Sequence, residues 1–342
     1  MSKSSKPRNN LVELFRFIYS LLVMGFHVQL YHYSEKEIDV FETGAVSVEF
    51  FFVLSGFFLP RSLEKLNKYE SMGFIKKIYI FMKNKIMALL NVHLVAIIAV
   101  IIIIACCDTS SFVDKFVPGI PSIFLVQMII VWSGDFDKAL IVPEWYISSM
   151  VICMLFMSII FLLFLKIIKP IYSTIILVGI LLIICLISGF ATSWKFNDNI
   201  TYDMRAWAEM CIGMFSYYLS NYVKSKTYNE CINILLKVIE IIGYCVPVIL
   251  GVIPVSVDYI VYFMMVTVIC AFCSCFITFS EKGNIIKNDK VNLVFGYLGY
   301  IFTNLFVSSC YYNINLLFKK RYSKMGEIPY CVSRNFNSFF PI

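Results

Sequence analysis

Two ionisable residues inside one long apolar stretch are the first candidates for chemistry in this sequence. Arg16 and His27 lie eleven positions apart within the segment 11–33. Ionisable groups at membrane depth are costly, so a functional role is the default explanation for them. On a helix, eleven steps return to within about 20° of the same face, and the two residues stand about 16 Å apart. Because arginine keeps its charge and histidine titrates near neutrality, the pair predicts an anion anchor and a proton-handling group.

The next apolar segment adds a carboxylate. Residues 48–59 read V-E-F-F-F-V-L-S-G-F-F-L, with Glu49 near the outer end and a small Ser55-Gly56 pair half-way along. A short connection makes the two segments antiparallel neighbours, so we expect Glu49 to contact His27. The alternatives are a glutamate that merely reaches the membrane interface and a Ser-Gly pair that only allows close helix packing.

Hydropathy sets the class of protein that must position these residues. Hydrophobic residues make up 60% of the chain, charged residues 15%, and the mean hydropathy is +0.80. This composition is typical of an all-α polytopic membrane protein, a helix bundle in which each span crosses about 30 Å of hydrocarbon. The segment 120–133 is short, so a re-entrant or interfacial placement stays open for it. We expect about ten transmembrane helices, at 11–33, 44–60, 85–107, 120–133, 143–165, 171–192, 205–223, 234–256, 258–280 and 291–314.

The chain reads as one membrane domain, 1–318, followed by a polar tail, 319–342. No long linker rich in Pro, Gly or Ser separates a second domain. The net charge of +7 comes from cations that flank apolar segments, and it is therefore no evidence for a nucleic-acid partner. The first segment has no cleavage pattern and reads as a retained helix.

Basic residues orient the chain in the membrane. Three cations precede the first segment, the connection 34–43 holds one lysine against four acids, and residues 61–85 hold seven Lys and Arg. The positive-inside rule therefore predicts a cytoplasmic N-terminus and a basic, helical cytoplasmic loop over 61–85. Such a loop suits either lipid headgroups or an anionic ligand such as a nucleotide-containing cofactor.

Several other polar residues have structural interpretations. Glu13 lies one turn before Arg16, and Arg205 and Glu209 are spaced i and i+4, so each set is placed to form an ion pair. His93 fits a helix-packing or water-cavity histidine better than a cofactor contact. The twelve cysteines are scattered through apolar segments, so we expect neither a disulfide framework nor a bound metal.

Four motifs resemble the acyltransferase-3 family of integral-membrane O-acyltransferases. Arg16 and His27, followed by V-E-F-F-F-V-L-S-G-F at 48–57, are similar to the opening of that family. P-E-W-Y-I at 143–147 resembles its Trp-centred motif, and R-A-W-A-E-M-C-I-G-M at 205–214 resembles a later glycine-containing helix. The resemblance spans about residues 11–300.

The resemblance implies a ten-helix bundle that takes an acyl group, usually acetyl, from acyl-CoA on the cytoplasmic side. It implies delivery to a hydroxyl of a cell-envelope or exported polysaccharide, or of a lipid-linked sugar precursor. His27 matches the essential histidine, Arg16 the arginine placed with the cofactor, and Lys83 and Lys85 the basic residues that open the third helix. The implied partners are the lipid bilayer, the sugar acceptor and envelope glycosyltransferases or exporters.

The mechanism that these residues suggest is direct acyl transfer. His27, oriented by Glu49, removes the proton of the acceptor hydroxyl as this attacks the thioester carbonyl. Ser55 and Trp145 are expected to contact substrate, and no spacing in the sequence supports a covalent acyl intermediate on Ser55.

Two departures from the family pattern keep other functions open. The run 83–88 lacks the usual arginines and proline, and the late motif at 298–309 ends in a serine where the family has a histidine. One alternative is a catalytically weakened acyltransferase relative that serves as a partner or sensor. The other is a transporter or flippase for an envelope precursor, with its ionisable residues lining a path.

Overall fold

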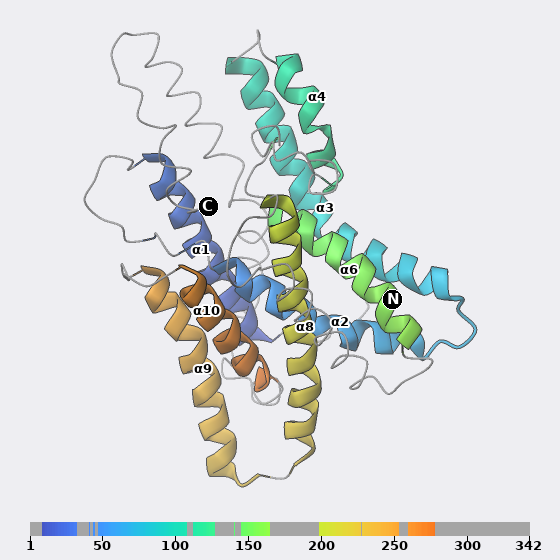
Figure 1. Ribbon diagram of the computed structural model, residues 1–342, viewed down its shortest axis with the longest axis vertical. Helices are drawn as coiled ribbons and strands as arrows, with labels where there is room; N and C mark the ends of the chain where they lie inside the picture. Colours follow the sequence, from blue (N-terminus) through green and yellow to red (C-terminus); the bar gives the residue numbers. More distant parts are fainter. Residues whose placement is uncertain are drawn as a thin grey trace, which may run out of the picture.

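The computed structural model of the protein describes residues 9–32, 41, 44, 47–107, 112–126, 140, 145–164, 198–226, 228–252 and 259–277. Every regular element in these residues is an α-helix (Figure 1). The helices are α1 (Asn10–His32), α2 (Val48–Asn67), α3 (Phe74–Cys107), α4 (Phe112–Ile123), α6 (Trp145–Phe164), α8 (Asp198–Ser225), α9 (Glu230–Val252) and α10 (Tyr259–Ser274).

Helices occupy most of the predicted apolar segments. The segments 171–192 and 291–314 and the boundary at residue 318 lie outside the described residues, so the count of ten helices and the domain boundary stay predictions. By length and composition, α6 and α9 are each able to cross a membrane. A third span is added if the two arms of α3, which meet at 44°, are taken together.

Only the first half of the segment expected at 120–133 lies within the described residues, and that half contains the end of a helix and a turn. The helix in this region, α4, begins earlier and ends at Ile123, and the chain then turns at Leu125, whose φ of 57° is left-handed. The amide of Val126 closes this turn by donating to the carbonyl of Pro121 at 3.1 Å. Twelve residues give a helix of about 18 Å, too short to cross the hydrocarbon of a bilayer.

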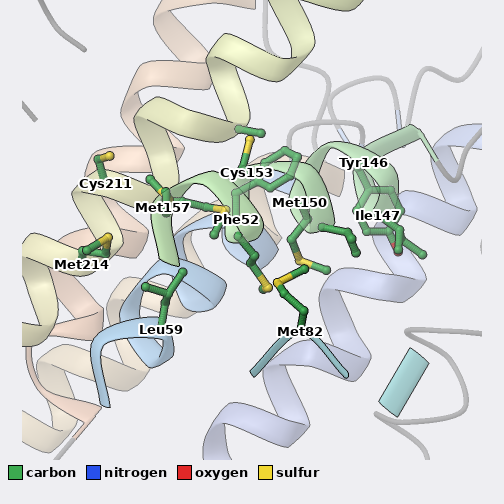
Figure 2. Packing of buried hydrophobic residues seen from close by; sticks show 14 of the residues in the cluster. Phe52, Leu59, Met82, Tyr146, Ile147, Met150, Cys153, Met157, Cys211 and Met214 are labelled. Atoms are coloured by element: carbon green, nitrogen blue, oxygen red, sulfur yellow. The ribbon is translucent and has the colours of Figure 1, made fainter. Parts of the chain in front are cut away.

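α2 is the central helix of the described bundle, and it packs against α1, α3, α6, α8 and α10. Its two sides belong to different apolar clusters. Phe52 and Leu59 join a cluster with α3, α6 and α8 that is rich in methionine (Figure 2). Phe50 and Phe57 join a second cluster with α1, α9 and α10. The apolar part of α2, residues 48–60, is thus packed on both of its sides.

The closest approach in the bundle joins α2 to α8. A Cβ atom added to Gly56 would overlap the carbonyl oxygen of Met210, and one added to Gly213 would overlap the carbonyl oxygen of Val53. Small residues let two helix backbones meet in this way. The packing role expected for the glycine of the Ser-Gly pair is confirmed.

A tyrosine ties α1 to two other helices. The Tyr19 ring stacks on Phe50 of α2, with centroids 4.1 Å apart and planes 5° from parallel. Its hydroxyl donates to the backbone carbonyl of Tyr244 on α9 at 3.0 Å. The contact fixes the register of α1, the helix that carries both Arg16 and His27, against the centre of the bundle.

Candidate functional site

Arg16 on α1 lies at the first of two groups of charged side chains. Its guanidinium donates to the Glu13 carboxylate at 2.9 Å, which confirms the expected ion pair. The guanidinium carbon also lies 5.9 Å from the centroid of the Phe58 ring on α2. The Arg16 side chain keeps 32% of its surface exposed. Arg16 is therefore held in place by one carboxylate and one ring, yet it stays accessible.

The two predicted cofactor lysines lie on different sides of α3. The half-buried Lys85 has its ammonium 5.7 Å from the Phe81 ring centroid. Lys83 is exposed and lies 5.8 Å from the ring centroid of Tyr79. Two steps along a helix rotate a side chain by about 200°, so the two lysines face nearly opposite sides.

A carboxylate further along α2 anchors the last turns of α8. Glu64 accepts hydrogen bonds from the Tyr217 and Tyr218 hydroxyls at 3.0 and 2.9 Å. Arg61 lies one turn before Glu64 and is exposed. Sequence reasoning missed this contact, although a tandem of tyrosines near the end of an apolar helix is a signal for a polar acceptor on a neighbour.

The second group of charged side chains lies between α2, α6 and α8. Glu49 of α2 forms an ion pair with Arg205 of α8, and the Arg205 Nε lies 3.8 Å from a carboxylate oxygen of Glu209. All three side chains are at most 2% exposed. The guanidinium carbon of Arg205 also lies 5.9 Å from the ring centroid of Trp145, the first residue of α6.

This arrangement tests some of the contacts expected from the sequence, and other expected contacts stay predictions. The pairing of Arg205 with Glu209 across one helical turn is confirmed. The main chain of His27 lies in α1, but its side chain is outside the described residues, so its contact with Glu49 stays a prediction. Glu49 is paired with Arg205, a partner 156 positions away in the sequence that no local pattern indicates.

Ser55 lies at the junction of α2 and α6. Its hydroxyl donates to the thioether sulfur of Met150 at 3.0 Å. A thioether is a weak acceptor and no base, so this contact offers no activation of the hydroxyl as a nucleophile. The geometry agrees with the sequence in giving no support to an acyl-serine intermediate.

His93 has a packing role where α3 meets α4. Its Nε2 hydrogen-bonds to the carbonyl of Ser122 at 2.9 Å, and the ring is buried. The Ser122 hydroxyl in turn accepts a hydrogen bond from the amide of Leu140 at 3.2 Å. The helix-packing interpretation of this histidine is confirmed.

The part of the chain that the structure describes contains no candidate metal site. No three His, Cys, Asp or Glu side chains gather there closely enough to hold an ion. Cys270, from the run of three cysteines, instead lies with its sulfur 3.9 Å from the Tyr19 hydroxyl oxygen in the buried core.

Long apolar helices with charged side chains sealed between them define an integral membrane protein. The family model described as Acyltransferase domain, that of the acyltransferase-3 family, matches residues 9–319. The match covers nearly the whole chain, so the chain belongs to this family of membrane acyltransferases, and the resemblance seen in its motifs is confirmed. Neither the curated proteins nor the solved structures compared with the chain gave a match.

Proposed function

We propose that the protein is an O-acyltransferase of the cell membrane, with its N-terminus in the cytoplasm. It moves an acyl group, acetyl in the simplest case, from acyl-CoA to a hydroxyl of a cell-envelope or exported polysaccharide or of its lipid-linked precursor. Membership of an acyltransferase family supports the reaction type. The donor and the acceptor are those that the resemblance of the motifs implies, and the orientation follows from the distribution of basic residues.

The observation that carries the proposal is the placement of two cations on α1 and α3. Arg16 stays 32% exposed beside Glu13, and Lys85 is half-buried with its ammonium 5.7 Å from the Phe81 ring centroid. These two side chains carry one more positive charge than Glu13 neutralises. This excess favours an anion, which the phosphates of CoA supply. Lys83 is exposed on the other side of α3, and its part in donor binding rests on the resemblance of the motifs alone.

His27 is proposed as the general base of the transfer. It follows Arg16 by eleven residues on the same helix, about 16 Å further along the axis. The acceptor oxygen bonds to the acyl carbon, and the thioester carbon–sulfur bond breaks. The proton that the imidazole takes from the hydroxyl passes to the departing thiolate of CoA. No metal takes part in this scheme.

The acceptor is proposed to be a sugar hydroxyl. Trp145 supplies a half-buried aromatic ring at the start of α6, which is suited to pack against the apolar face of a sugar. Ser55 lies on the adjoining face of α2, bonded to Met150 of α6. Envelope glycosyltransferases or exporters would supply or remove such an acceptor and are therefore the proposed protein partners.

Transfer of labelled acetyl tests the proposal. Membranes that contain the protein are given acetyl-CoA labelled in the acetyl group, with the total envelope polysaccharide of the host cell as acceptor. His27→Ala is expected to lower the rate by about 10²–10⁴-fold. Arg16→Ala and Lys85→Ala are each expected to raise the KM for acetyl-CoA about tenfold, the effect of one charge-assisted contact. Lys224→Ala, at an exposed lysine of α8, is the control.

Three results would contradict the proposal in different ways. Equal transfer by His27→Ala and wild-type membranes would remove the histidine from the mechanism. Movement of an envelope precursor across vesicles without acyl-CoA, and with no label transferred, would favour a flippase. Binding of CoA without turnover would indicate the catalytically weakened relative.

A further inference from the structure

We propose that Arg205 is a positioning residue: through its ion pair with Glu49 and its contact with Trp145, it fixes the start of α6 against α2 and α8 and holds the indole ring for the acceptor. The inference rests on the proposed function in one respect, the assignment of Trp145 to acceptor binding. It also gives Glu49 a role that needs no contact with His27.

Three helices meet at the Arg205 side chain. The guanidinium belongs to α8, its ion-pair partner Glu49 to α2, and the Trp145 ring under it to α6. Phe52, three residues after Glu49, adds a second aromatic contact from α2, with ring centroids 6.3 Å apart. The indole is thus bounded by α8 and α2 at the point where α6 begins.

Burial gives this pair its importance. Arg205 and Glu49 are 2% and 0% exposed, so neither charge is solvated by water. Removing one member of a buried pair leaves the other uncompensated, which is far more costly than replacing both. A guanidinium is the cation best fitted to this site because its planar fork pairs with carboxylates and also stacks on an aromatic face.

The two carboxylates beside Arg205 are not equivalent. Glu49 contacts the guanidinium directly, whereas Glu209 comes only to 3.8 Å of it. Within the described residues, no group other than Arg205 pairs with the carboxylate of either glutamate, so the two differ only in their distance from the guanidinium. Arg205 is a cation placed between two acids, so its loss leaves the most buried charge without a partner. Glu209 is the more distant acid, so the loss of its charge should cost least.

A set of glutamine variants measures this order without reference to activity. The unfolded-to-folded ratio in detergent is expected to rise about 100-fold or more for Arg205→Gln, about tenfold for Glu49→Gln and less than about threefold for Glu209→Gln. Adding Glu49→Gln to Arg205→Gln is expected to lower the ratio, because the double variant no longer buries an unpaired Glu49. Glu70→Gln, at an exposed glutamate in the turn before α3, is the control.

Kinetics then separate positioning from a merely structural role. Arg205→Lys keeps the charge but loses the planar fork, and it is expected to raise the KM for the acceptor about tenfold while the KM for acetyl-CoA stays within about twofold. Trp145→Leu is also expected to raise the KM for the acceptor. A variant that only loosens the fold would lower kcat without separating the KM for the acceptor from the KM for acetyl-CoA.

Two outcomes would overturn the inference. The ion-pair role fails if Glu49→Gln is as harmful in the Arg205→Gln background as alone, because the two residues then act independently. The positioning role fails if Arg205→Lys changes the KM for acetyl-CoA and leaves the KM for the acceptor unchanged. Failure of the proposed function looks different, since wild-type membranes would transfer no acetyl while the glutamine variants still showed their coupling.

Discussion

Adding one methyl group where α2 meets α8 should destabilise the protein, and the structure indicates by how much. In Gly56→Ala or Gly213→Ala the new Cβ meets a backbone carbonyl oxygen of the facing helix, not the end of a flexible side chain. The backbone cannot rotate away, so the two helices must separate by on the order of 1 Å. A gap of that size forfeits a quarter to a half of each dispersion contact along the interface.

The expected cost is about 1–3 kcal/mol for either variant, the usual range for overpacking a well-packed interior. The double variant should cost less than the sum, because the separation forced by the first methyl makes room for the second. Thermal unfolding in detergent, followed by circular dichroism, measures the difference.

Gly73→Ala is the matched control, because a Cβ at Gly73 would have no atom within 4 Å. It should change the stability by no more than about 0.5 kcal/mol. Wild-type stability in both helix-contact variants would refute the close approach of α2 and α8. So would an equal loss in Gly73→Ala, since the effect would then follow from losing glycine and not from crowding.

Three further substitutions probe single contacts. Tyr19→Phe removes the hydroxyl that bonds to the Tyr244 carbonyl and should cost about 1 kcal/mol, measured by thermal unfolding. Tyr217→Phe leaves Glu64 with one of its two tyrosine donors; proteolysis near the end of α8 should become faster, while an unchanged rate would contradict the anchoring role. His93→Leu removes the hydrogen bond between α3 and α4, so amide exchange in α4 should accelerate, and protection equal to wild type would show that the contact is dispensable.

Hydropathy predicted where helices lie but not where they end. The spans expected at 44–60 and 205–223 correspond to α2 and α8, yet α2 continues to Asn67 and α8 already begins at Asp198. Hydropathy marks the part of a helix that suits lipid, and a helix that continues into polar residues gives no such signal. The end of α4 at Ile123 gave no hydropathy signal for a related reason, because the turn at Leu125 depends on local backbone conformation inside an apolar run.

Whether an ion pair could be predicted depended on how far apart its two partners lie along the chain. The pairs Glu13–Arg16 and Arg205–Glu209 were predictable because residues three or four apart on a helix are neighbours in any fold. The pairing of Glu49 with Arg205 was not, since it follows from the way in which α2 packs on α8. The local sequence identified the residues, and only tertiary packing showed which of them meet.

The sulfur atoms at the centre of the bundle make its interior pliable and open to oxidation. Met82, Met150, Met157 and Met214 meet around α2 (Figure 2), and unbranched thioether chains change shape more readily than branched aliphatic ones. Small shifts of α6 along its neighbours should therefore meet little resistance. Peroxide that reaches this seam would turn apolar sulfur into polar sulfoxide and loosen the bundle from within.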